Sequence, residues 1–138
     1  MTQLFNFDWK FQAGDLKNAQ SADYDDSGWR TLDLPHDFQI EQPWDKSAGG
    51  ARGFKAMGKG WYRKSFKADP AWKDKRVLLD FEGIMLLGDV WVNGQKVGST
   101  DYGYIGFEVD ITKLLTYDKE NVVAVCASTG KTGGSRWY

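Results

Sequence analysis

The sequence holds 138 residues, a length that suits one domain with one hydrophobic core. Its 18 basic residues nearly balance its 19 acidic ones, so the net charge of −1 gives no electrostatic reason to expect nucleic acid or an anionic membrane as a partner. One cysteine excludes a disulfide within the chain, and no apolar stretch is long enough to cross a bilayer.

The first residues have neither the basic start nor the apolar run of a secretory signal. We therefore expect a soluble chain. If the chain was cut from a longer precursor, an export signal would have been removed with that cut. The compartment of the parent therefore stays open, and a bacterial parent in the periplasm or outside the cell is compatible with the sequence.

The first predicted strands are short segments that mix aromatic and charged residues. Residues 9–11 and 61–66 show a rough two-residue alternation, and residues 76–81 form a short apolar run between polar flanks. These three segments are predicted to be strands.

Segment 42–60 has a different composition, with five glycines and no strand pattern. Structureless loops of this length are usually functional or disordered, so we predict one long loop. Two interpretations are compatible with each other. In the first, the loop is a flap that borders a ligand site, with Trp44 and Phe54 as candidate sugar-stacking platforms. In the second, it is an excursion that only a neighbouring domain orders.

A hairpin is the clearest signal in the second half of the chain. Asn93 and Gly94 separate the apolar segment 90–92 from the segment 96–98. Because the tight turn that matches strand twist needs a positive φ at both central residues, Asn-Gly between two such segments predicts a two-residue β-hairpin.

Two more strands are predicted over residues 104–109 and 121–127, and residues 110–115 between them fit one helical turn at most. Cys126 lies in the last of these apolar runs and is predicted to be a small buried side chain. Many short strands at intervals near ten residues, joined by turn residues, predict an all-β fold. We expect an antiparallel β-sandwich with long crossover connections.

The tryptophans divide into two groups. Trp9, Trp61 and Trp91 fall in strand patterns, where large aromatic side chains most often fill a core. Trp44 in the long loop and Trp137 near the end have no such explanation. Exposed aromatic faces would suit the C–H faces of sugar rings.

The lone histidine, His36, stands next to Asp37. A His–Asp pair either orients an imidazole for proton transfer or fixes a loop, and the sequence favours the structural role. No serine or cysteine has a nucleophile motif, and a zinc-type site would need further ligands at coordinating spacing. We therefore expect no metal and no cofactor.

Three motifs of aromatic and turn residues follow one another along the chain: Trp-Arg-Thr-Leu-Asp-Leu-Pro-His-Asp at 29–37, Gly-Trp-Tyr-Arg-Lys at 60–64 and Val-Trp-Val-Asn-Gly at 90–94. In combination they resemble the N-terminal domain of family 2 glycoside hydrolases, most closely the bacterial β-galactosidase branch. The resemblance implies a jelly roll of the galactose-binding-domain-like type over residues 1–138. It also implies that the last strand is truncated, because the chain stops within a glycine-rich family motif at 133–138.

The resemblance implies a parent enzyme that is a retaining O-glycosyl hydrolase acting on terminal β-galactosides. The nucleophile and the acid of such enzymes belong to a barrel that this chain does not reach, so no residue here is expected to be catalytic. Retaining glycosidases need two carboxyl groups about 5 Å apart. The four glutamates are scattered over different predicted elements: Glu41, Glu82, Glu108 and Glu120.

The resemblance also suggests which residues lie near the sugar: His36, Asp37, Trp44, Tyr102, Arg136 and Trp137. In some relatives an asparagine that helps to hold the substrate stands about where Met85 stands here, and an acidic residue stands about where Ser135 stands. Both departures put the identity of the sugar in doubt.

The first hypothesis is therefore a non-catalytic domain that shapes the substrate pocket and binds a terminal β-galactoside, with the missing barrel as its partner. The alternatives are a free-standing carbohydrate-binding module and a structural spacer domain of a β-glucuronidase- or β-mannosidase-type enzyme. A truncated edge strand also predicts self-association.

Overall fold

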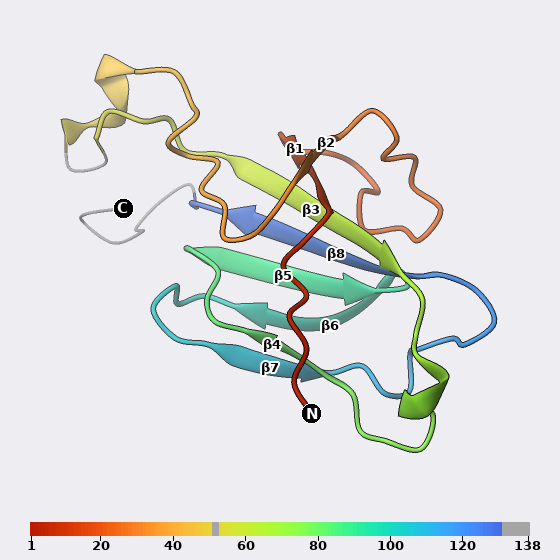
Figure 1. Ribbon diagram of the computed structural model, residues 1–138. Helices are drawn as coiled ribbons and strands as arrows, with labels where there is room; N and C mark the ends of the chain where they lie inside the picture. The colour runs from red at the N-terminus through yellow and green to blue at the C-terminus, as the bar shows by residue number, and fades with distance from the viewer. Residues whose placement is uncertain (51–52, 131–138) are drawn as a thin grey trace.

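The computed structural model describes residues 1–50 and 53–130, and this part of the chain is built from antiparallel strands (Figure 1). The strands are β1 Trp9–Ala13, β2 Arg30–Leu32, β3 Lys59–Phe66, β4 Leu78–Phe81, β5 Leu87–Val92, β6 Gln95–Thr100, β7 Phe107–Asp110 and β8 Asn121–Ser128, with short 3-10 helices η1 Lys46–Ala48 and η3 Pro70–Trp72. One sheet has the order β2-β1-β3-β8-β5-β6, and the other pairs β4 with β7. The predicted antiparallel sandwich is confirmed. No helix in the described part is long and apolar enough to span a membrane.

Strand β8 lies at the centre of the large sheet, and every residue from 121 to 127 is buried. Because side chains alternate across a strand, Val123 and Val125 face the small sheet, where Val109 of β7 belongs to the same core cluster. On the opposite face, Cys126 joins Trp61 in a second cluster. The large sheet is therefore covered on both faces, which explains the continuous apolar run of β8.

Two of the three strand tryptophans and the lone cysteine are buried. Trp9 and Trp61 are buried, as predicted. Trp91 is only half-buried and stacks on Trp61 with ring centroids 5.3 Å apart. Cys126 is buried, and desolvation raises the pKa of its thiol to about 11, so it acts as a small apolar side chain.

A buried arginine holds the loop that covers the second cluster. The Arg63 side chain is 1% exposed and points away from the small sheet. Its guanidinium donates to Asp26 Oδ2 at 2.8 Å, to the carbonyl of Ala19 at 2.6 Å and to the carbonyl of Ser21 at 2.8 Å. One planar group with five N–H donors thus fixes the loop between β1 and β2 against the sheet.

The predicted hairpin is also present. Asn93 and Gly94 have φ values of 50° and 81°, the positive values that the tight turn requires. The Asn93 side chain makes two further hydrogen bonds: its Nδ2 donates to the carbonyl of Leu114 at 2.8 Å and to Asn121 Oδ1 at 2.9 Å. The turn thereby anchors the segment before β8, which forms turns rather than a helix.

Most strand bounds differ from the predicted ones by a few residues. Strand β2 was not predicted, since three residues carry too little pattern to be recognised. Strand β7 starts at Phe107 rather than at 104 because the loop before it packs closely on Phe81 and Met85. A Cβ on Gly106 would lie 2.8 Å from the carbonyl oxygen of Phe81, and one on Gly103 would overlap Met85.

A pocket and a flap at one end of the sandwich

Antiparallel pairing brings several strand ends to one end of the sandwich. Ala13 at the end of β1 pairs with Gly60 of β3, and Lys59 at the start of β3 pairs with Ser128 at the end of β8. Leu87 at the start of β5 also pairs with Ser128. The loops that precede β3 and β5 and those that follow β6 and β8 therefore meet at this end, seen on the left of Figure 1.

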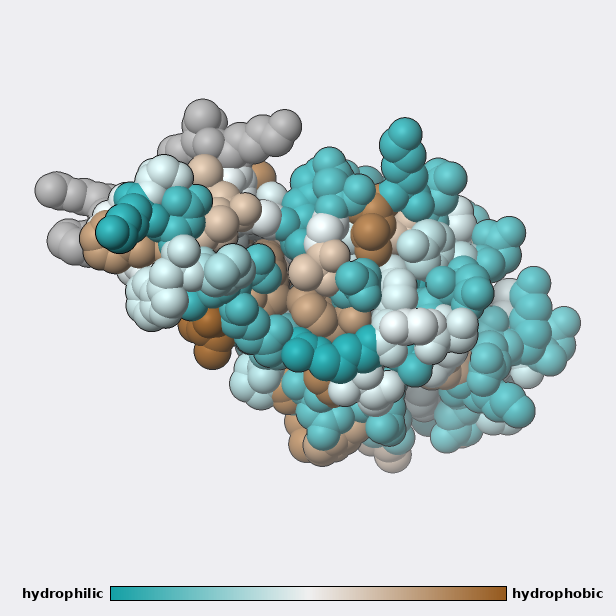
Figure 2. Space-filling view, turned by 90° about the horizontal axis from the view of Figure 1, so that it is seen from above, coloured by the Kyte–Doolittle hydropathy of each residue, from teal (hydrophilic) through white to brown (hydrophobic). Residues whose placement is uncertain are grey.

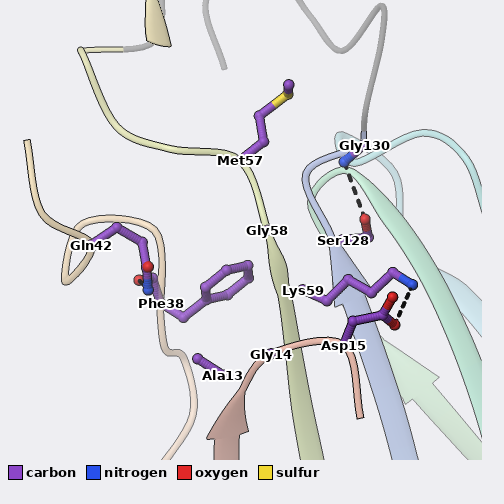
Figure 3. Close-up of a pocket in the computed structure, with 10 residues that line it drawn as sticks. All are labelled: Ala13, Gly14, Asp15, Phe38, Gln42, Met57, Gly58, Lys59, Ser128 and Gly130. Atoms are coloured by element: carbon purple, nitrogen blue, oxygen red, sulfur yellow. Dashed lines mark hydrogen bonds and ion pairs between the residues drawn. The ribbon is translucent and has the colours of Figure 1, made fainter. Parts of the chain in front are cut away.

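An open pocket of about 600 Å³ lies over these strand ends. Its walls come from four segments of the chain: Ala13, Gly14 and Asp15, then Phe38 and Gln42, then Met57, Gly58 and Lys59, and last Ser128 and Gly130. In Figure 3, Phe38 and Gln42 lie on one side of β3, and the Asp15–Lys59 pair lies on the other. The pocket thus extends across the start of β3 from one side to the other.

Hydrogen bonds between backbone segments hold the pocket open. Thr129 N donates to the carbonyl of Gly58 at 3.0 Å, while Gly58 N donates to Thr129 Oγ1 at 2.9 Å. Gly14 N donates to the carbonyl of Lys59 at 2.9 Å. The Lys59 Nζ lies 2.7 Å from Asp15 Oδ1, and this hydrogen bond raises the pKa of the lysine. The lysine is therefore charged at neutral pH.

His36 is held by a network that joins the segment after β2 to β3. The Leu34–Pro35 peptide before it is cis. His36 Nε2 lies 3.0 Å from Glu41 Oε1, and Nδ1 lies 2.9 Å from the hydroxyl of Tyr62. A carboxylate only accepts and a guanidinium only donates, and both approach Nε2, because Arg30 Nη2 lies 3.2 Å from the same nitrogen. The imidazole is 12% exposed, so both of its nitrogens are occupied in a mostly buried place.

Arg30 completes this network from β2. Its Nη2 donates to Glu41 Oε2 at 2.7 Å and to Oε1 at 3.0 Å. The hydrogen bonds from Arg30 and then from His36 hold the pKa of Glu41 below its ordinary value. Burial raises the pKa of Tyr62, which therefore stays protonated and able to donate. The four side chains fix the segment that carries Phe38 and Gln42 to the pocket.

This network predicts an acid-sensitive contribution to stability. A carboxylate whose folded pKa is lowered stabilises the fold above its ordinary pKa of 4.5, and the contribution is lost as the pH falls through the lowered value. Glu41→Gln is therefore expected to lower the urea midpoint of unfolding at pH 7, and the difference from the wild type should shrink as the pH falls below 4.5 and vanish below the lowered pKa. Glu120→Gln, an exposed turn position, is the control. A constant difference between pH 7 and pH 3 would contradict the assignment.

Asp37 does not form the pair with His36 that their adjacency suggested as one option. Its Oδ1 accepts a hydrogen bond from Gln39 N at 2.9 Å, an interaction that stabilises the turn. The hydrogen bonds of both residues are those of a loop held in place, which is the structural role that the sequence favoured.

The flap before β3 has more internal structure than one plain loop. Trp44 and Lys55 form an isolated antiparallel bridge, Asp45 N donates to the carbonyl of Phe54 at 2.7 Å, and η1 follows the bridge. The Trp44 indole is 74% exposed, and the Lys55 Nζ lies 4.2 Å from its ring centroid. Strand β3 begins at Lys59, so the flap is slightly shorter than predicted.

Of the remaining predicted site residues, Tyr102 lies at the same end. Tyr102 is 51% exposed in the loop after β6, with its ring centroid 5.7 Å from that of Tyr104. Arg136 and Trp137 lie outside the described residues. Met85 precedes β5 and packs against Gly103 in the loop that carries Tyr102.

Asp15, Lys59, Gln42 and Ser128 were not anticipated as site residues. No motif marks them, since they come from separate segments that only the strand register brings together. The described part of the chain holds no group of three metal-ligating side chains. Asp15 is the acidic residue that lines the pocket.

Residues 9–134 match the family described as "Glycosyl hydrolase 2 galactose-binding domain-like". The chain belongs to glycoside hydrolase family 2. It is 40% identical over 136 residues to the β-galactosidase BoGH2A of Bacteroides ovatus, covering 97% of this chain and 16% of that protein. It is 36% identical over 127 residues to a β-glucuronidase of Formosa agariphila, covering 90% of this chain and 13% of that protein.

Solved structures agree with this family assignment. A glycosyl hydrolase family 2 member from Bacteroides cellulosilyticus superposes with a TM-score of 0.92 at 38% identity, covering 99% of this chain and 18% of that one. A Bacteroides uniformis β-glucuronidase gives 0.80 at 30% identity, covering 96% of this chain and 15% of that one. The predicted galactose-binding-like fold is thus confirmed, and the chain spans less than a fifth of these family members.

Proposed function

We propose that this chain is a non-catalytic N-terminal domain of a β-galactosidase-like family 2 hydrolase, where it shapes the substrate pocket and binds a terminal β-galactoside. The observation that carries the proposal is the gathering of exposed apolar side chains at the pocket end. Apart from the first seven residues, the exposed large hydrophobic side chains of the described chain lie in the loops of this end or, for Leu87, at the first residue of β5: Ile40, Trp44, Phe54, Met57, Leu87, Tyr102, Tyr104 and Ile105.

Figure 2 shows the same asymmetry, with brown and tan surface toward the flap end and the centre, and a mostly hydrophilic opposite end. A soluble protein rarely exposes so many large apolar side chains together unless they contact a partner or a ligand. The end that carries the pocket is therefore the face we propose to meet the catalytic barrel of the parent, with the substrate between them.

The assignment of bond cleavage to another domain rests on the carboxylates. A retaining mechanism needs two carboxyl groups that face each other across the sugar. Asp15, which lines the pocket, is engaged by Lys59. The purified 138-residue chain is therefore expected to release no chromophore from aryl β-galactosides, whereas a full-length hydrolase containing it should; turnover by the chain alone would refute the proposal.

Trp44 offers the direct test of the flap. In a full-length hydrolase carrying this domain, Trp44→Ala is expected to lower kcat/KM for aryl β-galactosides by roughly three- to tenfold, because it removes an aromatic surface that contacts the bound sugar. Trp72→Ala, on η3 at the opposite end of the sandwich, is the matched control. Equal kinetics for both variants would favour a structural spacer.

The relatives named as β-glucuronidases supply the second candidate, a β-glucuronide as the parent's substrate. Comparing kcat/KM of the full-length hydrolase on paired aryl β-galactosides and β-glucuronides separates the two. A preference for the glucuronide would replace the galactoside in the proposal and leave the pocket-shaping role intact.

A further inference from the structure

We propose that the pocket over the strand ends binds one neutral hexopyranose by itself, with Asp15 and Lys59 as its polar anchor. The inference rests on the proposed carbohydrate function. The inference extends that function by placing a sugar in a pocket that this chain forms without any other domain.

The floor of the pocket is backbone, which leaves room for a ring. Gly14 and Gly130 have φ values of 129° and 77°, a backbone region that residues other than glycine rarely adopt. A volume of about 600 Å³ lies within the range typical of small-molecule sites. Because the hydrogen bonds between Gly58 and Thr129 fix the floor, a ligand would meet a preformed surface rather than pay to order it.

The Asp15–Lys59 pair supplies both kinds of hydrogen bond that a sugar needs. The carboxylate accepts from hydroxyl groups, and the ammonium donates through the hydrogens that Asp15 does not occupy. The Asp15 side chain is 79% exposed and that of Lys59 38%, so a ligand can reach both. Hydrogen bonds to charged groups are stronger than neutral ones, which suits a small ligand with little area to bury. Since the two charges cancel, the pair favours a neutral sugar over a uronate.

The opposite wall offers apolar and amide contacts. Phe38 lies across β3 from the ion pair, with Gln42 beside it, and Met57 lines the pocket just before the strand begins (Figure 3). The C–H face of a pyranose ring would rest against this side while hydroxyls on its far edge reach Asp15 and Lys59. Hydroxyls on the near edge would meet the Gln42 amide.

The test is a two-dimensional NMR titration of the 138-residue chain with galactose and glucose. We expect millimolar binding of at least one of them, with the shifting amides concentrated at Gly14, Gly58 and Gly130. Lys59→Met and Asp15→Asn should each weaken this binding by about tenfold, the effect of one hydrogen bond to a charged group. Retained peak dispersion would show that the variants still fold.

The matched control is Lys96→Met, which breaks the ion pair of Lys96 with Asp89 on the same sheet. It should leave sugar binding unchanged. The proposal would be overturned if neither sugar shifted any amide, or if Lys96→Met and Lys59→Met weakened sugar binding equally. Tighter binding of glucuronate than of either neutral sugar would overturn the preference for a neutral sugar. A silent titration would leave the kinetic test of Trp44 standing, so the two proposals fail separately.

Discussion

Arg63→Met is expected to lower the free energy of unfolding by about 3 to 5 kcal/mol, the usual cost of removing one partner from a buried ion pair. The change leaves Asp26 without its partner and frees two carbonyls in the loop between β1 and β2. Chemical denaturation followed by circular dichroism would measure the loss. Methionine fills a similar volume, so the change reports mainly on lost hydrogen bonds and charge.

Arg76→Met provides the comparison for Arg63. Arg76 also pairs with an aspartate, Asp110, at 2.8 Å, but its side chain is 73% exposed. Exposed ion pairs contribute little because water solvates both charges in either state. Losses of similar size in the two variants would show that Arg63 does not hold the loop as described.

Asn121→Ala is expected to cost about 3 to 4 kcal/mol, because it leaves several buried groups without partners at once. The Asn121 side chain is fully buried, accepts from Thr116 N at 2.8 Å and from Asn93 Nδ2 at 2.9 Å, and donates to the carbonyl of Thr116 at 2.8 Å. The same denaturation experiment measures the loss. Native-state hydrogen exchange should also show faster exchange in the hairpin that Asn93 closes.

Gln95→Ala is the control for Asn121. It removes an amide of similar chemistry from an exposed position at the start of β6 in the same hairpin. Its stability should stay close to that of the wild type. A small effect for Asn121→Ala would mean that water replaces the lost partners and that the turn is not anchored through this side chain.

Local pattern was sufficient to predict most of the sheet. The alternation in 61–66 and the Asn-Gly pair at 93–94 express constraints that neighbouring residues impose on each other, so they can be read without the fold. Strand β2 was missed because its three residues become a strand only by pairing with β1. Secondary structure set by a distant partner leaves little trace in the local sequence.

The site shows the same division between local and distant information. The motif around His36 was recognised, but its partners Tyr62 and Glu41 could not be chosen by adjacency, which pointed to Asp37 instead. The pocket depends on register, since Lys59 and Ser128 are 69 residues apart and paired. Exposure of Trp44 followed from the lack of strand pattern around it, and is seen in the structure.

The position of β8 has a consequence for synthesis. It is the last described strand in the sequence, yet it joins β3 to β5 at the centre of the large sheet. On the ribosome, β1 to β3 and the β5–β6 hairpin emerge first and share no ladder until residue 128 is free. This part of the nascent chain should therefore remain open to proteases and dependent on chaperones until residue 128 has left the ribosome, and then close in one step.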